Sequence, residues 1–459
     1  MDIYAIVLAA GKGTRMKSSL PKVAHELLYK PMIKHVCDEL KKINIKETIV
    51  VVGHGADIVK GIMKDDVTYV MQEEQLGTGH AVKMAYDVLK DKEGITLVLN
   101  GDAPLIRKET LEALIQKHID GKHQATIMSA HCDVSKSYGR IVRNDKGNVM
   151  KVVEAKDASP EQLQITEMNT GEYCFDNTLL FEALSKVNNQ NAQQEYYLTD
   201  VIEILNDMGS TVGSYVIDDF DEVGGINDRL QLAEAQKKLR QRINTELLLD
   251  GVTIIDPDNT YIARDVKIGQ DTVIEPGCII KGDSCIGNNC HIGPYCEFTN
   301  VMVKDNVEIK FSVLSDSVIE SGVDIGPYAR LRQNCHILEN VHMGNFVEMK
   351  NTTFGAGSKC AHLSYIGDTT VGKDVNIGCG TITSNYDGKN KFKTIIKDNV
   401  FVGCNSNLVA PVTLESGAYV AAGSTITQSV PEEAFAIARQ RQVTKEGYAK
   451  VLKEKREKK

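Results

Sequence analysis

The C-terminal half of the chain repeats an aliphatic residue every six positions, a period that neither an α-helix nor a flat strand produces. The repeat begins at residue 262 and is restored after several interruptions. The residues in phase are Ile262, Ile268, Ile274, Ile280, Ile286, Ile292, Ile319, Ile325, Leu331, Ile337, Met343, Val371, Ile377, Ile396, Val402, Leu408, Leu414, Val420 and Ile426. Six residues make one flat face and three faces make a triangular coil, so stacked coils bury the aliphatic side chains. The pattern predicts a parallel β-helix.

Small residues are expected at the other inward position of each coil, among them Cys278, Cys290, Val307 and Ala418. Because Cys278, Cys290 and Cys296 share one phase of the repeat, we interpret them as small buried side chains rather than as a zinc site. The eleven cysteines do not indicate disulfides, since their number is odd and no C-x-x-C pair occurs.

The overall composition is that of a globular protein with two or three domains, with 459 residues of which 42% are hydrophobic. The net charge of −9 argues against a general nucleic-acid-binding protein. We interpret the basic run at residues 450–459 as a solvated tail. No leader pattern and no run of about 18 apolar residues occurs. We therefore expect a cytoplasmic protein without membrane insertion.

The first half of the chain alternates β-like and helical patterns. Short apolar runs at residues 3–8, 47–52, 67–71 and 95–100 predict strands. Amphipathic segments between them, at residues 34–42 and 81–89 for example, predict helices. This alternation predicts an α/β domain with a mostly parallel sheet covered on both faces, in which ligands bind beyond the carboxyl ends of the strands.

The loop after the first predicted strand, L-A-A-G-K-G-T-R at residues 8–15, is rich in small residues whose N–H groups can face phosphate oxygens. Lys12, Arg15 and Lys22 add positive charge. The spacing matches neither the P-loop nor the dinucleotide fingerprint. We interpret the loop as a phosphate cradle, and residues 77–79 as a second polar edge at the start of a helix.

Asp102 directly follows the strand predicted at residues 95–100. A carboxylate at such a position is costly unless it caps, pairs or binds a metal. Facing a basic phosphate loop, it is best explained as a Mg²⁺ ligand. Polar groups at residues 138–140, 153–156 and 169–171 suit the recognition of sugar hydroxyls.

A single amphipathic helix is predicted over residues 229–249, started by Asn227 or Asp228 and ended at Gly251. It would span roughly 30 Å. The chain is thus divided into residues 1–228, a linker helix at 229–250, and the β-helix with its tail at 251–459.

Two interruptions of the six-residue repeat carry polar side chains that do not serve stacking. Residues 361–365 contain His362, and residues 385–393 form a basic loop. Arg332, Lys350 and Lys391 would attract a phosphorylated ligand near that histidine.

The N-terminal motifs resemble those of the nucleotidyltransferases that join sugar 1-phosphates to nucleoside triphosphates. They are L-A-A-G-K-G-T-R-M with P-K, E-Q-L-G-T-G-H-A, G-D-A-P-L and G-I-N-D-R-L. The resemblance implies that UTP is bound by Leu8, Ala9, Ala10, Gly11, Lys22, Gln72, Gly77, Thr78 and Asp102. It implies that the sugar is held by Gly139, Glu154, Asn169 and Asn227, that Mg²⁺ is held by Asp102 and Asn227, and that Arg15 and Lys22 act in catalysis. Asn100 departs from the family pattern, which often has an aromatic residue there.

The C-terminal motifs resemble those of the hexapeptide acyltransferases, which are left-handed β-helices that assemble as trimers and use acetyl-CoA. They are R-L-R, N-F-V-E-M-K, A-H-L-S-Y-I-G, V-N-I-G and N-Y-D-G-x-N-K-F-K-T. The resemblance implies that His362 is the general base and that Asn385 orients the amine. It implies that the sugar phosphate is bound by Arg332, Lys350, Tyr365, Asn376 and Lys391. It implies that acetyl-CoA is bound by Cys379, Asn385, Tyr386, Cys404, Ala422 and Arg439. Cys379 and Cys404 depart from the usual Ala and Ser.

Together the motifs resemble the bifunctional bacterial uridyltransferase/acetyltransferase family of cell-wall precursor synthesis. That resemblance implies a Rossmann-like nucleotidyltransferase domain followed by a left-handed parallel β-helix. It implies acetylation of glucosamine 1-phosphate by acetyl-CoA, then coupling of N-acetylglucosamine 1-phosphate to UTP with release of pyrophosphate, in a homotrimer. The alternatives are a single-activity nucleotidyltransferase whose β-helix oligomerises, and a non-enzymatic scaffold. Without the resemblance, thymidine or adenosine triphosphate fits the residues equally well.

Overall fold

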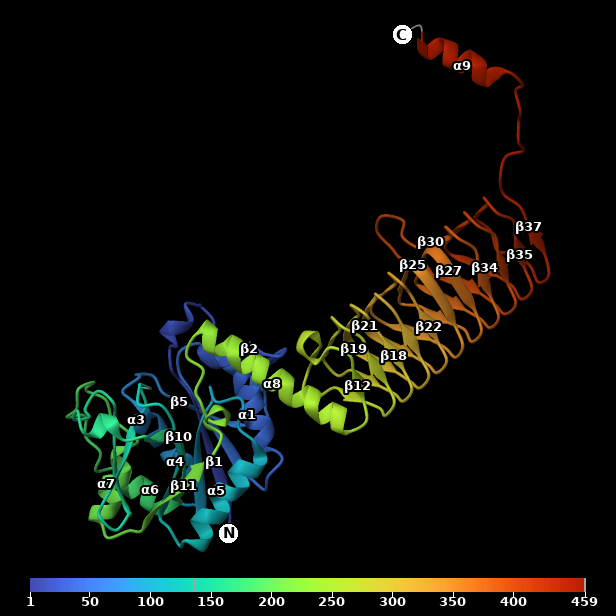
Figure 1. Cartoon of the computed structure of the whole chain (residues 1–459). Coiled ribbons are helices and arrows are strands. Elements are labelled where there is room, and N and C mark those ends of the chain that lie inside the picture. The colour runs from blue at the N-terminus through green and yellow to red at the C-terminus, as the bar shows by residue number, and fades with distance from the viewer. Residues whose placement is uncertain (136, 458–459) are drawn as a thin grey trace. The chain divides into compact units, whose positions relative to one another are not determined.

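The computed structural model describes residues 1–135 and 137–457, and Lys458 and Lys459 of the predicted basic tail lie outside them. The chain divides into two compact units, Met1–Leu239 and Arg240–Lys459 (Figure 1). Within the described residues, no helix has both the length and the apolar character needed to cross a membrane.

The N-terminal unit is built on a sheet whose central strand is β1 (Ile3–Ala9). It pairs in parallel with β4 (Glu47–Val52) on one side and with β6 (Ile95–Asn100) on the other, and β4 pairs in parallel with β5 (Thr68–Met71). The strands expected at residues 3–8, 47–52, 67–71 and 95–100 are therefore confirmed.

The other side of the sheet is mixed. β10 (Glu167–Asp176) runs antiparallel between β6 and β7 (Ala125–His131), and β11 (Val212–Ile217) pairs in parallel with β7. A hairpin of β8 (Arg140–Arg143) and β9 (Val149–Val153) branches from β10. The pairing of β10 with β7 shifts register between Asn169 and Tyr173, so β10 contains a bulge.

The sheet is buried on both faces, as its continuous apolar strands predict. Ile6 of β1 belongs to one apolar core, and its neighbours Ala5 and Val7 belong to the other. The covering helices are α1 (Met32–Leu40), α2 (Ala56–Met63), α3 (Thr78–Lys83), α4 (Tyr86–Leu89), α5 (Lys108–Asp120), α6 (Asn177–Leu184) and α7 (Asp200–Asp207). Two short elements, β2 (Glu26–Leu27) and β3 (Lys30–Pro31), form a separate hairpin.

The single helix expected over residues 81–89 is wrong, because the segment forms the two short helices α3 and α4. The break follows from a tighter turn, in which Met84 and Ala85 donate their N–H groups to the carbonyls of Ala81 and Val82, three residues back. Neither proline nor glycine marks this change in the sequence.

The helix predicted over residues 229–249 is confirmed as α8 (Arg229–Leu249). Asp228 caps its start, since Asp228 Oδ1 accepts from the N–H of Gln231 at 2.9 Å. Its end is a glycine turn in which Gly251 has φ 95°, and Val252 donates to the carbonyl of Leu247 at 3.0 Å.

The C-terminal unit is a stack of short parallel strands, consistent with the left-handed β-helix expected from the repeat (Figure 1). In the first coils, strands three apart in sequence lie on successive coils, so Ile262, for example, pairs with Ile280, and both are fully buried. Further along, where longer strands such as β19 and β25 occur, strands two apart also pair. Cys278, Cys290 and Cys296 are buried in the same stack, as the phase predicts.

The first strands of this unit are β12 (Thr253–Ile254), β13 (Tyr261–Ile262), β14 (Lys267–Ile268), β15 (Val273–Ile274), β16 (Ile279–Lys281), β17 (Cys285–Ile286), β18 (His291–Ile292), β19 (Glu297–Val303), β20 (Glu308–Ile309), β21 (Val313–Ile319), β22 (Asp324–Ile325), β23 (Arg330–Leu331) and β24 (Cys335–Ile337). The rest are β25 (His342–Lys350), β26 (Thr353–Phe354), β27 (Lys359–Gly367), β28 (Thr369–Val371), β29 (Asn376–Ile377), β30 (Ile382–Ser384), β31 (Thr394–Ile396), β32 (Phe401–Val402), β33 (Asn407–Val409), β34 (Val412–Leu414), β35 (Tyr419–Val420), β36 (Thr425–Ile426) and β37 (Phe435–Ala436). A last helix, α9, covers Tyr448–Glu457.

Candidate active sites

The loop after β1 forms one wall of a cavity of about 310 Å³, here called the loop cavity. Its other walls come from the segments that follow β5 and β6. The lining residues are Leu8, Ala9, Ala10, Gly11, Lys22, Val23, Gln72, Gln75, Gly77, Thr78, Ala81, Asn100, Asp102 and Glu195. This set contains every residue predicted to bind the nucleotide, so the strand ends do converge on one place. Lys12, in contrast, is exposed and does not line the loop cavity.

The segment before α3 is held in place by hydrogen bonds to its own backbone and to a distant loop. Gln72 Nε2 donates to the carbonyl of Gly77 at 3.1 Å, and the N–H of Gly79 donates to the carbonyl of Tyr196 at 2.8 Å. The polar edge predicted at residues 77–79 is therefore fixed against the loop cavity.

Lys22 lies between Asp102 and Asn227. Its Nζ forms an ion pair with Asp102 Oδ2 and donates to Asn227 Oδ1 at 3.1 Å. Arg15 also donates to Asn227 Oδ1, at 2.8 Å. Asn227 is brought to Asp102 because the N–H of Ile226 donates to the Asp102 carbonyl at 2.9 Å. Two oxygen atoms thus face one positive charge, which is the kind of donor pair that Mg²⁺ prefers.

A second cavity, of about 570 Å³, lies beside the β8–β9 hairpin and is here called the hairpin cavity. It is lined by Arg15, Thr78, Asn100, Asp102, Ser135, Ser137, Tyr138, Gly139, Glu154, Asn169, Thr170, Gly171, Gly225, Asn227 and Gln231. All four residues predicted to hold the sugar are in this set. Thr78, Asn100 and Asp102 line both cavities, so the two binding regions are continuous.

One carboxyl and one phenol in the hairpin cavity have raised pKa values. Burial raises the pKa of Glu154, whose carboxylate accepts a hydrogen bond from Thr199 Oγ1 at 3.3 Å. Burial also raises the pKa of Tyr138 to about 12, so its hydroxyl stays protonated and can donate to a ligand. Tyr138 belongs to the polar segment at residues 138–140 that was expected to recognise sugar hydroxyls, although the family resemblance assigned a role only to Gly139 of that segment.

Asn100 and Glu172 form a contact that the sequence does not suggest. Asn100 Nδ2 donates to the Gly171 carbonyl at 3.2 Å and to Glu172 Oε1 at 3.3 Å. Glu172 is fully buried, and burial raises the pKa of its carboxyl to about 8, with the Asp102 carboxylate adding to the rise. The carboxyl is therefore mostly neutral at pH 7.

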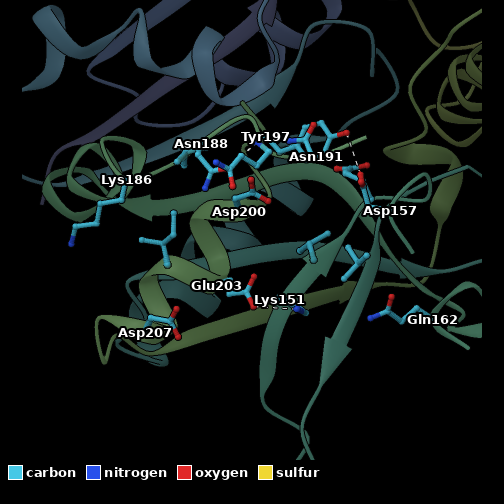
Figure 2. A pocket seen from close by; sticks show the side chains of 16 residues that line it. Lys151, Asp157, Gln162, Lys186, Asn188, Asn191, Tyr197, Asp200, Glu203 and Asp207 are labelled. Atoms are coloured by element: carbon cyan, nitrogen blue, oxygen red, sulfur yellow. Dashed lines mark hydrogen bonds and ion pairs between the residues drawn. The ribbon is translucent and has the colours of Figure 1, made fainter. Parts of the chain in front are cut away.

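A third cavity, of about 530 Å³, shares Glu154 with the hairpin cavity and extends toward α7. Figure 2 shows Lys151 beside Glu203, which form an ion pair of 3.1 Å, and Asp157 near Tyr197. Burial raises the pKa of Asp200 in this cavity to about 6. None of the predicted site residues except Glu154 lines it.

In the C-terminal unit, β27 presents His362 on an exposed face next to Asn345 of β25. His362 Nδ1 lies 3.0 Å from Asn345 Oδ1. Because that oxygen can only accept, Nδ1 carries the hydrogen and Nε2 is left as the basic nitrogen. Asn345 was not predicted as a site residue. Asn345 and His362 pair on successive coils, so aligning the coils of the repeat could have identified Asn345.

Three cations of the C-terminal unit, Arg332, Lys350 and Lys391, lie close to one another. The register places Arg332 next to Lys350, since the N–H of Arg332 donates to the carbonyl of Met349 at 2.9 Å. The ammonium of Lys391 and the guanidinium of Arg332 lower the pKa of Lys350, with Lys391 the stronger influence. The structure therefore brings the predicted phosphate-binding cations together. Asn376 lies on β29, which pairs with β27 at Lys359.

The basic loop at residues 385–393 closes on the same region. Asn385 Nδ2 donates to Asp368, and a side chain at Gly367 would collide with Tyr365 and Asn385. Asn385 and Tyr365 therefore approach each other across that glycine. Tyr386 is exposed, and its hydroxyl donates to the Gly388 carbonyl at 2.6 Å.

The remaining residues predicted to bind acetyl-CoA form a column along the coils. The N–H of Asn405 donates to the Cys379 carbonyl at 2.7 Å, which stacks Cys379 on Cys404. The N–H of Gly423 donates to the Cys404 carbonyl at 2.8 Å, which places Ala422 on the next coil. Arg439 follows, because its Cδ lies near Gly423. The thiol of Cys404 is exposed, so it stands where a ligand can reach it.

Two family models match separate parts of the chain. A model described as Nucleotidyl transferase matches residues 4–241, and one described as GMPPB C-terminal domain matches residues 258–342. The fold and the cavities at its strand ends therefore define the N-terminal unit as a nucleotidyl transferase.

Full-length relatives extend this to the whole chain. A protein from an Exiguobacterium species is 53% identical over 98% of this chain and 100% of its own length. One from a Geobacillus species is 54% identical over 97% of each chain, and one from Clostridioides difficile is 50% identical over 99% of each. All three are named Bifunctional protein GlmU. The chain belongs to this bifunctional GlmU family.

Proposed function

We propose that the two units divide the synthesis of UDP-N-acetylglucosamine between them. The chain is a bifunctional enzyme, a glucosamine-1-phosphate N-acetyltransferase and a UDP-N-acetylglucosamine pyrophosphorylase. Acetyl transfer belongs to the β-helix at residues 251–459, uridylyl transfer to residues 1–228, and residues 229–250 are the linker. The observation that carries the assignment is the pair of separate residue clusters, around Asp102 and around His362.

In uridylyl transfer, a phosphate oxygen of N-acetylglucosamine 1-phosphate attacks the α-phosphorus of UTP. A new P–O bond forms, and the bond to pyrophosphate breaks. Because the attacking oxygen is already an anion, no general base is required. Catalysis then depends on alignment by the two continuous cavities and on charge neutralisation by Arg15 and Lys22, whose cations converge on Asn227.

Asp102 and Asn227 fit the role of magnesium ligands because their oxygens face a common positive charge. Held by these two residues, Mg²⁺ would neutralise charge on the triphosphate. Lys22, which contacts both residues, would supply a further positive charge for the phosphate oxygens.

In acetyl transfer, His362 Nε2 takes a proton from the amine of glucosamine 1-phosphate as the amine nitrogen attacks the thioester carbon of acetyl-CoA. The carbon–sulfur bond breaks, and the proton leaves with the CoA thiol. Asn345 holds the imidazole in the tautomer that this step needs. Arg332, Lys350 and Lys391 bind the sugar phosphate, and the column from Cys379 to Arg439 binds CoA.

We further propose a homotrimer formed through the β-helix. An apolar ladder, Tyr295, Phe311, Tyr328 and Phe346, stacks along one corner with ring centroids 5.5–6.0 Å apart. Phe346 is 54% exposed and Leu363 is 60% exposed, directly beside Asn345 and His362. Exposed apolar surface of this kind marks an interface, so a second copy would cover the ladder and complete the site around His362.

The proposed function is tested with purified protein supplied with glucosamine 1-phosphate, acetyl-CoA, UTP and Mg²⁺, omitting each in turn. Omitting UTP or Mg²⁺ should stop the reaction at N-acetylglucosamine 1-phosphate, and omitting acetyl-CoA should stop it at the start. UDP-sugar formed at full rate without acetyl-CoA, or with another nucleoside triphosphate in place of UTP, would contradict the assignment.

A further inference from the structure

The loop and hairpin cavities meet at Asn100, one of three residues that line both. The orientation of its side-chain amide is fixed by the protein. The Gly171 carbonyl can only accept, so the group that faces it at 3.2 Å must be the Nδ2 donor. Glu172 Oε1 receives a second hydrogen bond from the same nitrogen at 3.3 Å.

The bulge in β10 makes this contact possible. Gly171 has φ +93°, and a Cβ there would lie 2.4 Å from Asn100 Nδ2, so only glycine allows the approach. The same bulge turns the Glu172 side chain into the protein interior, where it is 0% exposed and where its Oε2 has no hydrogen-bond partner among the described residues.

A buried carboxyl with one unused oxygen is costly to keep and adds nothing to an apolar core. Through its other oxygen, the carboxyl accepts from Asn100 Nδ2 and so helps to commit that nitrogen to the protein. Asn100 Oδ1 then remains available as an acceptor, since it accepts no hydrogen bond from any residue that the structure describes. An amide oxygen at the junction of two cavities is a good acceptor for a hydroxyl or N–H group of a ligand.

We propose that Glu172 is a positioning residue for uridylyl transfer, which holds Asn100 so that Asn100 Oδ1 accepts a hydrogen bond from the substrate at the junction of the two cavities. The donor is a sugar hydroxyl or amide N–H of N-acetylglucosamine 1-phosphate, or a ribose hydroxyl or base N–H of UTP. The inference rests on the proposed function of this site and names a contact within it.

The test measures KM for each substrate and kcat in Glu172→Gln, Glu172→Met and Asn100→Leu. Glu172→Gln keeps an acceptor for Asn100 Nδ2 and should keep both KM values within about twofold of wild type. Glu172→Met fills the same space without an acceptor and should raise KM for one of the two substrates by about five- to tenfold, with kcat changed less than about threefold. The substrate whose KM rises is the one that donates to Asn100.

Asn100→Leu leaves Glu172 in place and should raise the same KM by about tenfold. Because Glu172 acts through Asn100, the double variant should be no worse than Asn100→Leu alone. Acetyl transfer, measured on the same preparations, should stay at the wild-type rate and reports that the β-helix is intact, while a kcat for uridylyl transfer close to the wild-type value reports that the N-terminal unit is intact. If Glu172→Met fails to fold, Asn100→Leu still decides the outcome, since wild-type KM values in that variant overturn the proposal.

The proposal is also overturned if Glu172→Gln is as impaired as Glu172→Met, or if the effects of Glu172→Met and Asn100→Leu multiply. Failure of the proposed function is distinguishable from these results, because the wild-type protein would then make no UDP-sugar at all.

Discussion

The two units build their sites in opposite ways. The N-terminal unit collects residues from several strand ends around two adjoining cavities, and part of its site is buried, Gln72, Asn169 and Glu172 included. The β-helix keeps its interior for stacked aliphatic residues and leaves several of its predicted site residues on the outside, where His362, Lys391 and Arg439 are exposed, although Asn385 is buried.

The difference follows from the geometry of the two folds. A doubly wound sheet leaves a crevice at its carboxyl edge, so one chain can surround a ligand. A triangular stack has a filled interior and flat faces, so it can surround a ligand only with loops or with another copy. We therefore expect the two activities to respond independently to substitutions, and only the acetyl transfer site to depend on assembly.

The largest expected effect is at His362. His362→Ala removes the proposed base and should lower acetyl transfer by roughly 10²–10⁴-fold, while uridylyl transfer stays unchanged. The measurement is kcat for each half-reaction with its own substrates. His336→Ala is the matched control, since His336 faces Glu320 on another coil. Loss of both activities in His362→Ala would show that the two sites are not independent.

A substitution of Lys22 tests the site of the N-terminal unit. Lys22→Met removes the cation that contacts both Asp102 and Asn227 and should lower kcat for uridylyl transfer by about 10²–10³-fold, with acetyl transfer intact. Lys12→Met is the matched control in the same loop, because Lys12 is exposed and lines neither cavity. Equal effects of the two substitutions would contradict the assignment of Lys22.

Stability should depend on pH through the buried carboxyl of Glu172. The pKa of Glu172 is about 8 in the folded chain, above the usual value of about 4.3 when unfolded. The stabilising contribution of the neutral carboxyl is therefore fully present below about pH 4. It is lost as the pH rises through about 8. Gln at this position does not ionise. Between pH 5 and 8, the free energy of unfolding of the N-terminal unit should therefore fall by a few kcal/mol less in Glu172→Gln than in wild type.

The measurement is calorimetric unfolding of both proteins at pH 5 and pH 8. From pH 5 to pH 8, the Tm of the N-terminal unit should fall less in Glu172→Gln than in wild type. The Tm of the β-helix should be the same in the two proteins. An identical pH response of the N-terminal transitions would show that Glu172 is already ionised in the fold.

The smallest expected effect is at the open phosphate site. Lys391→Met removes one of three neighbouring cations and should raise KM for glucosamine 1-phosphate by about five- to tenfold, because exposed charges contribute modestly. Lys389→Met in the same loop is the control. The effect of Lys391→Met should shrink at high salt, and a salt-independent change would point to loop distortion instead.

The fold was largely predictable because both units are marked by regular patterns of apolar residues in the sequence. The six-residue repeat predicts stacked coils directly, and the alternation of apolar runs with amphipathic segments predicts the α/β unit. Two features escaped prediction. β10 runs antiparallel within the sheet, and the break between α3 and α4 arises from backbone hydrogen bonds that no residue type marks.

The candidate sites were predictable where function resides in loops that follow strands, as at residues 8–11 and at Asp102. They were not predictable where a residue acts by touching another one far along the chain. Asn345 meets His362 only because two coils stack in register, and Glu172 meets Asn100 only because β10 bulges. Such contacts depend on tertiary packing, which local sequence does not encode.

Two separate sites that act in sequence should complement each other when two proteins, each with one inactivated site, are mixed. Asp102→Ala and His362→Ala are each supplied with glucosamine 1-phosphate, acetyl-CoA, UTP and Mg²⁺, alone and then together. Asp102→Ala alone should accumulate N-acetylglucosamine 1-phosphate, His362→Ala alone should make nothing, and the mixture should form UDP-N-acetylglucosamine. A mixture that stays inactive, or an Asp102→Ala protein that no longer acetylates, would contradict the account.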